Sequence, residues 1–528
     1  MIRRKSREGT SRTLADGPGL SLRQIGRRYG TGDLKSPPPM EKPEVRTARN
    51  PNLLFIMTDQ QRRDALSCMG SRFVHTPSLD RLAVEGVRFT NAITPSPICV
   101  PARASVLTGL PTHQTGCITN PDRLRTPASD LTTFDDALTA HGYTAEYIGK
   151  WHAPEALLRP YSRLPTSVSL DTFYRGYLAE KGYGSPHQGA SHPYISPLSG
   201  QPYDPDPMDH VYRSLNLGRG HSRPEPGLPF GRDSVRAEHS VSAMIADETM
   251  RSIERLKDVP FSITSSFLFP HDPLIVPRPY CDSVRAADMA TPETFDDARM
   301  NTPYKDFVWQ MDDLERRHVH LLMARYYAAV QEVDHHIGRI LDALDTSGLT
   351  DNTLVVFTSD HGEMLGDHGL MTKFVHYREA VGVPLLMRMP GRIPEGSTVQ
   401  APVCLTDLFA TISDYLGVTP PDRRGRSLQS WIAGDAPEPD PIVFSQFEHW
   451  NVMAQTCEWK YVWSNHADEV DMLFDLTRDP GEVNNLLGAN PDRARYLQQA
   501  AAMKERLAEW MEETEHPWLE QLAATPVR

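Results

Sequence analysis

The sequence predicts an α/β protein whose central, mostly parallel sheet is flanked by helices. Short apolar runs such as 52–58 and 353–359 end in polar residues, which is typical of buried parallel strands. Segments with helical spacing of apolar residues separate these runs, and this alternation indicates a parallel sheet. From about residue 440, short strand-like pieces follow one another directly and lead into a helix. The change predicts a smaller C-terminal α+β subdomain with an antiparallel sheet.

The individual elements follow from local patterns, taken in chain order. Strands are expected at 52–58, 87–93, 143–152, 261–273, 352–363, 441–447 and 457–464. Helices are expected at 76–86, from residue 99 onward, at 132–142 and at 491–515. Twelve prolines between residues 153 and 230 interrupt any periodicity. They predict an irregular insertion over 153–235 that walls one side of a site and contains no long helix or strand.

We therefore expect three parts in the chain: an extension over 1–49, an α/β domain over 50–435 that includes the insertion, and a subdomain over 436–528. The extension carries twelve Lys or Arg against five Asp or Glu and is rich in Gly, Ser and Pro. This composition predicts disorder. An organelle transit peptide and a translation start at Met40 are the two alternatives for this segment.

Composition and charge exclude several classes of partner. The net charge is −13, and the first 49 residues carry +7 of it, which leaves −20 on the rest of the chain. Such a chain is not expected to bind nucleic acid. The sequence contains no run of about 18 apolar residues, so a membrane span is not expected. Six scattered cysteines and the lack of an apolar leader predict a cytoplasmic location. Composition does not determine the oligomeric state, and a homo-oligomer stays open.

Two pairs of polar residues follow apolar strands. Asp59 and Gln60 come after 52–58, and Asp360 and His361 come after 353–359. Because ligands of parallel sheets collect at the carboxyl ends of the strands, both pairs could converge on one divalent ion. Carboxylate and amide oxygens suit Ca²⁺, Mg²⁺ or Mn²⁺, while an imidazole favours a transition metal. The alternative is that each aspartate caps the helix that follows it.

The stretch "PICVPARASVLTG" places Cys99 where a helix begins. Pro101 lies in the first turn, a favoured position for proline, and Arg103 returns to the same face one turn later. A helix N-terminus beside an arginine is electropositive, which suits an activated nucleophile or a bound anion. The alternative is a buried structural thiol.

Seven motifs along about residues 50–520 together resemble the type I sulfatases. They are "NLLFIMTDQ", "CVPARASVLTG", "GYTAEYIGKWH", "PHDP", "TSDHGEMLGDHGL", "MTK" and "DLTRDPGEVNNL", and the second contains the family's Cys-x-Pro-x-Arg signature. The resemblance implies an alkaline-phosphatase-like fold and conversion of Cys99 to formylglycine by a separate maturation enzyme. It also implies a small-molecule sulfate ester as substrate and one divalent metal ion, with Ca²⁺ expected first and Mn²⁺ or Mg²⁺ as alternatives.

The same resemblance assigns roles to individual residues. The implied metal ligands are Asp59, Gln60, Cys99, Asp360 and His361. Arg103 would hold the hydrated formylglycine, His152 would take a proton from it, and His271 would protonate the leaving alcohol. The residues implied to bind the sulfate group are Lys150, Lys373 and Asn120. A metal and lysines would screen the charge of the sulfate so that a nucleophile can approach.

The sequence also departs from the common sulfatase pattern. Gln60 and His361 stand where many sulfatases have Asp and Asn, which removes one negative charge from the implied ligand set. Choline sulfatases and phosphonate monoester hydrolases resemble this chain at these positions. The hydrolases differ from it at Lys150 and His152, so the sequence favours sulfate monoesters over phosphonate monoesters and phosphodiesters. A further alternative is a non-catalytic, sulfatase-like binding protein in which Cys99 stays a thiol.

Overall fold

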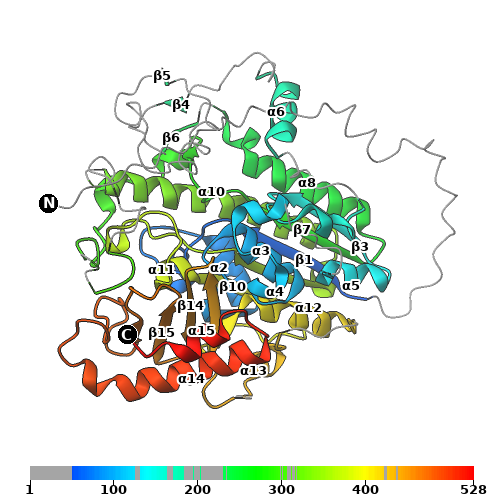
Figure 1. The fold of residues 1–528 in the computed structure, drawn as a ribbon. Coiled ribbons are helices and arrows are strands. Elements are labelled where there is room, and N and C mark those ends of the chain that lie inside the picture. Colours follow the sequence, from blue (N-terminus) through cyan, green and yellow to red (C-terminus); the bar gives the residue numbers. More distant parts are fainter. Residues whose placement is uncertain are drawn as a thin grey trace, which may run out of the picture. The chain divides into compact units, whose positions relative to one another are not determined.

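A large sheet with the strand order β11-β2-β10-β9-β1-β7-β3, with β12 also paired to β2, forms the centre of the computed structural model (Figure 1). The structure describes residues 50–124, 131–162, 170–183, 194–195, 202–203, 230–233, 235–297, 299, 301–305, 311, 316, 318–420, 425–435 and 438–528. The expected extension over 1–49 and most of the expected insertion over 153–235 lie outside the described residues.

The central sheet is mostly parallel, as the sequence predicts. Its strands are β1 (Asn52–Thr58), β2 (Val87–Ile93), β3 (Thr144–Gly149), β7 (Phe261–Ser266), β9 (Thr353–Ser359), β10 (Gly382–Arg388), β11 (Ser397–Val399) and β12 (Val403–Cys404). Strand β1 pairs in parallel with β7 and β9, and β3 pairs in parallel with β7. Only β10, among the described strands of this sheet, runs antiparallel to its neighbours β2 and β9.

Helices cover both faces of this sheet. Every residue of β1 is buried, and successive side chains of a strand point to opposite faces. Leu54 and Ile56 pack in one cluster with α2 (Pro77–Val84), α8 (Val241–Leu256) and α10 (Val319–Thr346). Leu53 and Phe55 pack in another with α5 (Phe134–Ala140) and α12 (Leu408–Leu416). The continuous apolar run of β1 is thus explained by burial on two faces.

A second sheet, antiparallel throughout, lies in the C-terminal part of the chain. Its strands, in the order of their pairing, are β13 (Val443–Phe447), β14 (Asn451–Gln455), β15 (Trp459–Ser464) and β16 (Met472–Asp475). Helices α14 (Leu497–Glu513) and α15 (Leu519–Ala524) pack on it through one apolar cluster. The predicted antiparallel sheet is confirmed, and β14 is a strand that the local pattern does not predict.

Smaller elements complete the described structure. They are α3 (Cys99–Thr108), α4 (Thr112–Thr115), α6 (Leu170–Glu180), α11 (Arg378–Val381), α13 (Gln429–Ala433) and the short strands β4 (Tyr194–Ile195), β5 (Pro202–Tyr203), β6 (Phe230–Arg232) and β8 (Leu274–Val276). The prediction of no long element within 153–235 is wrong for α6, because the stretch between Pro165 and Pro186 is free of proline. Among the described residues, no helix is long and apolar enough to cross a membrane.

Candidate active site

The carboxyl ends of four neighbouring strands bring the predicted site residues together. Strands β9, β1, β7 and β3 are adjacent in the sheet, and β1 is parallel to both β9 and β7. Asp59 follows β1, Asp360 follows β9 and Lys150 follows β3, while His271 lies five residues beyond the end of β7. The two aspartates are completely buried. The structure thus brings the two polar pairs close together at this edge of the sheet.

Cys99 is the first residue of α3, where the sequence predicts the start of a helix. Its side chain is buried, and its Sγ lies 3.1 Å from Nε2 of His361. The backbone N–H of Val100 donates to Oδ1 of Asn120 at 3.0 Å. Asn120 thus satisfies one of the free N–H groups at the start of α3. The structure places it beside Cys99, as a partner of the helix backbone.

Arg103 connects these elements in the interior. Its Nε donates to Oδ2 of Asp360 at 2.8 Å, and its Nη2 donates to Oδ2 of Asp59 at 3.0 Å. Its Nη1 donates to Oγ of Ser266 at 2.9 Å and to the carbonyl oxygen of Lys150 at 3.0 Å. Although burial alone would lower it, the pKa of Arg103 is raised by Asp360 and Asp59. A permanent cation therefore holds two carboxylates in fixed orientation.

The residues present fit a divalent cation. Asp59, Cys99, Asp360 and His361 each offer a ligand atom, and these four atoms lie within 4.8 Å of one another. Oδ1 of Asp59 is buried and makes no hydrogen bond within the part of the chain that the structure describes. A buried carboxylate oxygen without a partner is unfavourable. A cation bound by these carboxylates and the imidazole would satisfy it.

Gln60 borders this cluster with a fixed backbone and a fixed side chain. Its φ is +65°, a left-handed conformation that is uncommon for residues other than glycine. Its backbone N–H donates to Oδ1 of Asp360 at 3.1 Å. Its Nε2 donates to Oε2 of Glu363 and lies 3.4 Å from Oδ1 of Asp272, while its Oε1 accepts from Nζ of Lys373. Burial raises the pKa of Glu363, whereas the N–H groups of Leu365 and Thr372 lower it.

Two lysines approach the cluster from different segments. Nζ of Lys150 pairs with Oδ2 of Asp59. Lys373 is buried, and its Nζ lies 3.0 Å from Nε2 of His271. Gly149 permits the close turn before Lys150, because its φ is +98° and a Cβ there would lie 1.9 Å from the carbonyl oxygen of Ser266.

Two histidines differ in their surroundings. Nδ1 of His271 lies 2.6 Å from the carbonyl oxygen of Asp272, to which it donates when the proton is on Nδ1. In that tautomer Nε2 accepts from Lys373. His152 has a positive φ of 43°, and burial together with Lys150 lowers its pKa to about 4. His152 is therefore neutral at pH 7.

The cations set the charge state of the buried cysteine. Burial alone would raise the pKa of Cys99, but Lys373, Lys150 and His361 outweigh it and hold this pKa well below its usual value. Burial likewise opposes ionisation of Asp59, but Lys150 holds the pKa of this carboxyl below its usual range. The site is thus built to stabilise negative charge at Cys99.

Two residues of this site, Ser266 and Glu363, are not among those predicted from the motifs. Ser266 donates a hydroxyl to the carbonyl oxygen of Lys150 and accepts from Arg103, although it lies inside a run of small polar residues that carries no visible signal. Glu363 contacts Gln60 and lies within the quoted motif "TSDHGE", three residues after Asp360. Its position so close to a predicted metal ligand is the signal by which the sequence alone could have indicated Glu363 as a site residue.

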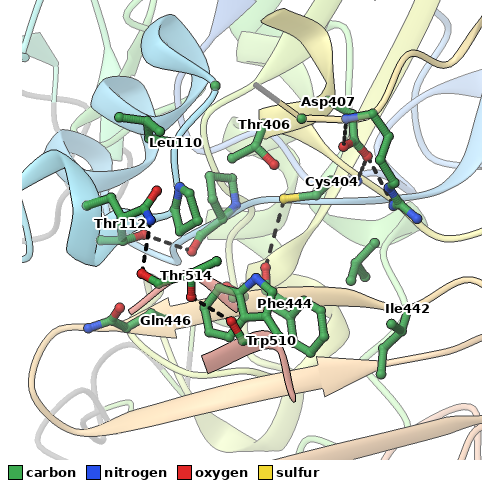
Figure 2. Close-up of a pocket in the computed structure, with 18 of the residues that line it drawn as sticks. Leu110, Thr112, Cys404, Thr406, Asp407, Ile442, Phe444, Gln446, Trp510 and Thr514 are labelled. Carbon is green, nitrogen blue, oxygen red and sulfur yellow. Dashed lines mark hydrogen bonds and ion pairs between the residues drawn. The ribbon is translucent and has the colours of Figure 1, made fainter. Parts of the chain in front are cut away.

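A separate cavity of about 540 Å³ lies between the α3–α4 connection and the C-terminal sheet. Its walls include Leu110, Thr112, Cys404, Asp407, Phe444 and Trp510. Figure 2 shows Cys404 near the middle of this wall, directed toward the carbonyl oxygen of Phe444 at 3.8 Å. We call it the Cys404 cavity. None of the predicted site residues lines it.

The comparisons with known proteins agree with the motifs. The sulfatase family model matches residues 51–418, and the model of the C-terminal region of N-sulphoglucosamine sulphohydrolase matches residues 366–513. An arylsulfatase of Clostridium perfringens is 28% identical over 85% of this chain and 93% of its own length. An N-acetylglucosamine-6-O-sulfatase of Bacteroides thetaiotaomicron is 28% identical over 90% of this chain and 88% of its own length.

A solved structure shares the fold. The phosphonate monoester hydrolase of Agrobacterium radiobacter superposes with a TM-score of 0.73 at 24% identity, covering 88% of this chain and 96% of the hydrolase. The fold is the alkaline-phosphatase-like architecture that the sequence resemblance implies. Because the family model spans well over half of the residues, the chain belongs to the sulfatase family.

Proposed function

We propose that this sulfatase cleaves a sulfate monoester to an alcohol and sulfate, with a formylglycine made from Cys99 by a separate maturation enzyme as its nucleophile. One observation carries the proposal. Cys99 begins a helix with its Sγ 3.1 Å from His361, inside a buried cluster of two carboxylates and several cations. A merely structural thiol needs none of these charged neighbours.

The proposed ligands of a divalent ion, Ca²⁺ in the first place, are Asp59, Gln60, Cys99, Asp360 and His361. The bound ion would supply positive charge against the sulfate oxygens. The hydrated formylglycine would supply one hydroxyl for attack on sulfur and a second through which sulfate is expelled.

The other residues bind the substrate and move protons. Arg103 orients the carboxylates of Asp59 and Asp360 and adds a positive charge that no change of pH removes. Lys150 and Lys373 hold the sulfate oxygens, with Asn120 beside them at the start of α3. These contacts favour the charge that develops in the transition state.

Proton transfer falls to the two histidines. His152, neutral at pH 7 because its pKa is about 4, takes the proton from the formylglycine hydroxyl as sulfate departs. His271, held through Nδ1, delivers a proton to the leaving alcohol from Nε2, which carries that proton only when Lys373 has turned from it to the sulfate oxygens. Such proton transfers contribute about 10²–10⁴-fold each.

A phosphonate monoester or phosphodiester hydrolase is the second candidate function. The Asp-Gln and Asp-His pairs and the fold shared with a phosphonate monoester hydrolase support it. The presence of Lys150 and His152 favours the sulfatase. A cytoplasmic location is also part of the proposal, supported by six cysteines that are all free thiols.

A panel of esters tests the proposal. The full chain is coexpressed with a formylglycine-generating enzyme, and the peptide containing Cys99 is analysed by mass spectrometry. Choline sulfate, nitrophenyl sulfate and a phosphonate monoester are then assayed. We expect the aldehyde at position 99 and a higher kcat/KM for a sulfate ester than for the phosphonate. An unmodified thiol without sulfate release would instead support a binding protein, and a preference for the phosphonate would support the second candidate.

A further inference from the structure

We propose that Glu363 is a positioning residue that determines whether the oxygen or the nitrogen of the Gln60 amide faces the metal site. The inference rests on the proposed function in one respect, because it assumes that a divalent cation binds beside Gln60. It assigns a task to a residue outside the predicted ligand set.

The need for such a residue follows from the chemistry of an amide. A carboxylate has two oxygens, and either can bind a cation. An amide has one acceptor oxygen and one NH₂ group that only donates. Hard divalent cations take oxygen ligands, so a glutamine serves only when its oxygen is turned toward the ion. A glutamine ligand therefore depends on whatever fixes its orientation.

Glu363 is built to accept hydrogen bonds. Its side chain is buried, and its Oε1 accepts from the backbone N–H of Leu365 at 2.9 Å and from that of Thr372 at 2.5 Å. Its Oε2 accepts from Nε2 of Gln60. Three N–H groups thus converge on one carboxylate. Two of them belong to the backbone and cannot turn away, so the carboxylate itself is fixed.

The surroundings of Gln60 all favour the same orientation. Its Nε2 faces the carboxylates of Glu363 and Asp272, and its Oε1 faces the ammonium group of Lys373. The reverse orientation would place an oxygen against two carboxylates and an NH₂ group against a cation. The backbone is held as well, because its N–H donates to Asp360 and its carbonyl oxygen accepts from the hydroxyl of Tyr326 at 2.8 Å.

A partner that holds a metal ligand in one orientation acts on metal affinity without touching the ion. The hydrogen bond from Gln60 to Glu363 is a contact of this kind.

A double-mutant cycle tests the inference through metal affinity, which requires no turnover. The affinities of the full chain for Ca²⁺ and Mn²⁺ are measured by competition with a chelator for the wild type, Glu363→Gln, Gln60→Glu and the double variant. We expect the Glu363→Gln variant to bind both ions about 10–100-fold more weakly. The oxygen of the introduced amide stays with the backbone N–H groups of Leu365 and Thr372, so its NH₂ group faces the NH₂ group of Gln60. The amide of Gln60 then turns over to avoid this contact. In the double variant, the amide introduced at 363 donates to the carboxylate introduced at 60, and the affinity recovers.

Glu379→Gln is the matched control. Glu379 is also buried, its Oε1 accepts from Nε of Arg378 at 2.5 Å, and its backbone carbonyl oxygen accepts from the N–H of Glu363. The variant therefore removes a carboxylate from the same neighbourhood without touching Gln60. We expect its metal affinity to stay within about threefold of the wild type.

The outcomes separate this inference from the proposed function. Glu363→Gln binding as tightly as the wild type, or a double variant no tighter than Glu363→Gln, overturns the inference alone. A wild type that binds neither ion overturns it together with the proposed metal site. If the four metal affinities follow the expected pattern but the protein turns over no sulfate ester, the proposed function alone is overturned. If Glu363→Gln does not fold, the double variant compared with Gln60→Glu carries the test, because a tighter double variant still supports the inference and an equal one overturns it.

Discussion

Cys99 and Cys404 are both buried free thiols, yet their surroundings give them opposite properties. Cys99 is 2% exposed and Cys404 is 7% exposed. Lys373, Lys150 and His361 hold the pKa of Cys99 well below its usual value. Burial and Asp407 raise the pKa of Cys404 to about 11. Burial alone therefore does not distinguish a nucleophile from a structural cysteine, and the neighbouring charges do.

The same contrast holds between the two regions around these cysteines. At the candidate active site, charged side chains arrive from the ends of four strands and are almost completely buried. At the Cys404 cavity, Arg426 pairs with Asp407 and Glu438, and its side chain is 30% exposed. A buried cluster of ionised groups whose pKa values are shifted is thus the feature that points to a functional site.

The largest expected effect is on turnover, and it compares the two cysteines directly. Cys99→Ala should lower kcat by at least about 10⁴-fold, because the proposed nucleophile is lost. Cys404→Ala should stay within about threefold of the wild type, because its sulfur contacts Phe444 and packs in an apolar cluster, away from the proposed ligands. Both variants are coexpressed with the maturation enzyme and assayed on the preferred ester. Equal turnover in the two variants would show that the nucleophile lies elsewhere.

The next effect concerns stability and compares the two arginines. Arg103→Met removes the cation from two fully buried carboxylates and should lower the free energy of unfolding by about 3–5 kcal/mol. Arg426→Met breaks a screened ion pair with Glu438 and an ion pair with the buried Asp407, whose carboxylate still accepts from the backbone N–H groups of Cys404 and Arg426. A smaller loss of about 1–3 kcal/mol is therefore expected. Urea unfolding in the presence of a metal chelator measures both. Similar losses in the two variants would contradict the contrast between a fully buried and a partly exposed arginine.

The sequence contains enough to predict most of the site. Apolar runs that end at Thr58 and Ser359 mark the strand ends, and so place the polar residues that follow them. The helix start at Cys99 is marked by a proline in its first turn. The contacts of Ser266 and the pairing of the antiparallel β10 with β2 and β9 bring together residues far apart in the chain. Such pairing leaves no local pattern, because hydrophobic periodicity reports which face is buried and says nothing of the partner.

The smallest expected effect is a response to acid on the side of the molecule that holds the Cys404 cavity. His516 is buried between aromatic rings, with ring centroids 5.1 Å from Trp518 and 4.3 Å from His113. Its Nδ1 accepts from the backbone N–H of Trp518 at 3.2 Å, which requires the neutral imidazole. Burial, and then His113, lower the pKa of His516 from 6.5 to about 3.

The direction of the pH dependence follows from this lowered pKa. Above pH 6.5 the imidazole is neutral in both states, and its contribution to stability is complete. As the pH falls from 6.5 toward 3, the unfolded chain binds a proton that the folded chain does not, so stability falls by up to about 1.4 kcal/mol per pH unit. His516→Gln should flatten this slope, whereas His449→Gln, at an exposed position between β13 and β14, should keep it. Urea unfolding between pH 7 and pH 5 measures the slopes with and without Ca²⁺.

His516 contacts none of the proposed metal ligands, so Ca²⁺ should raise the stability without changing the slope. Parallel slopes for the wild type and His516→Gln would contradict the prediction, because they would show that this histidine already binds its proton in the folded chain.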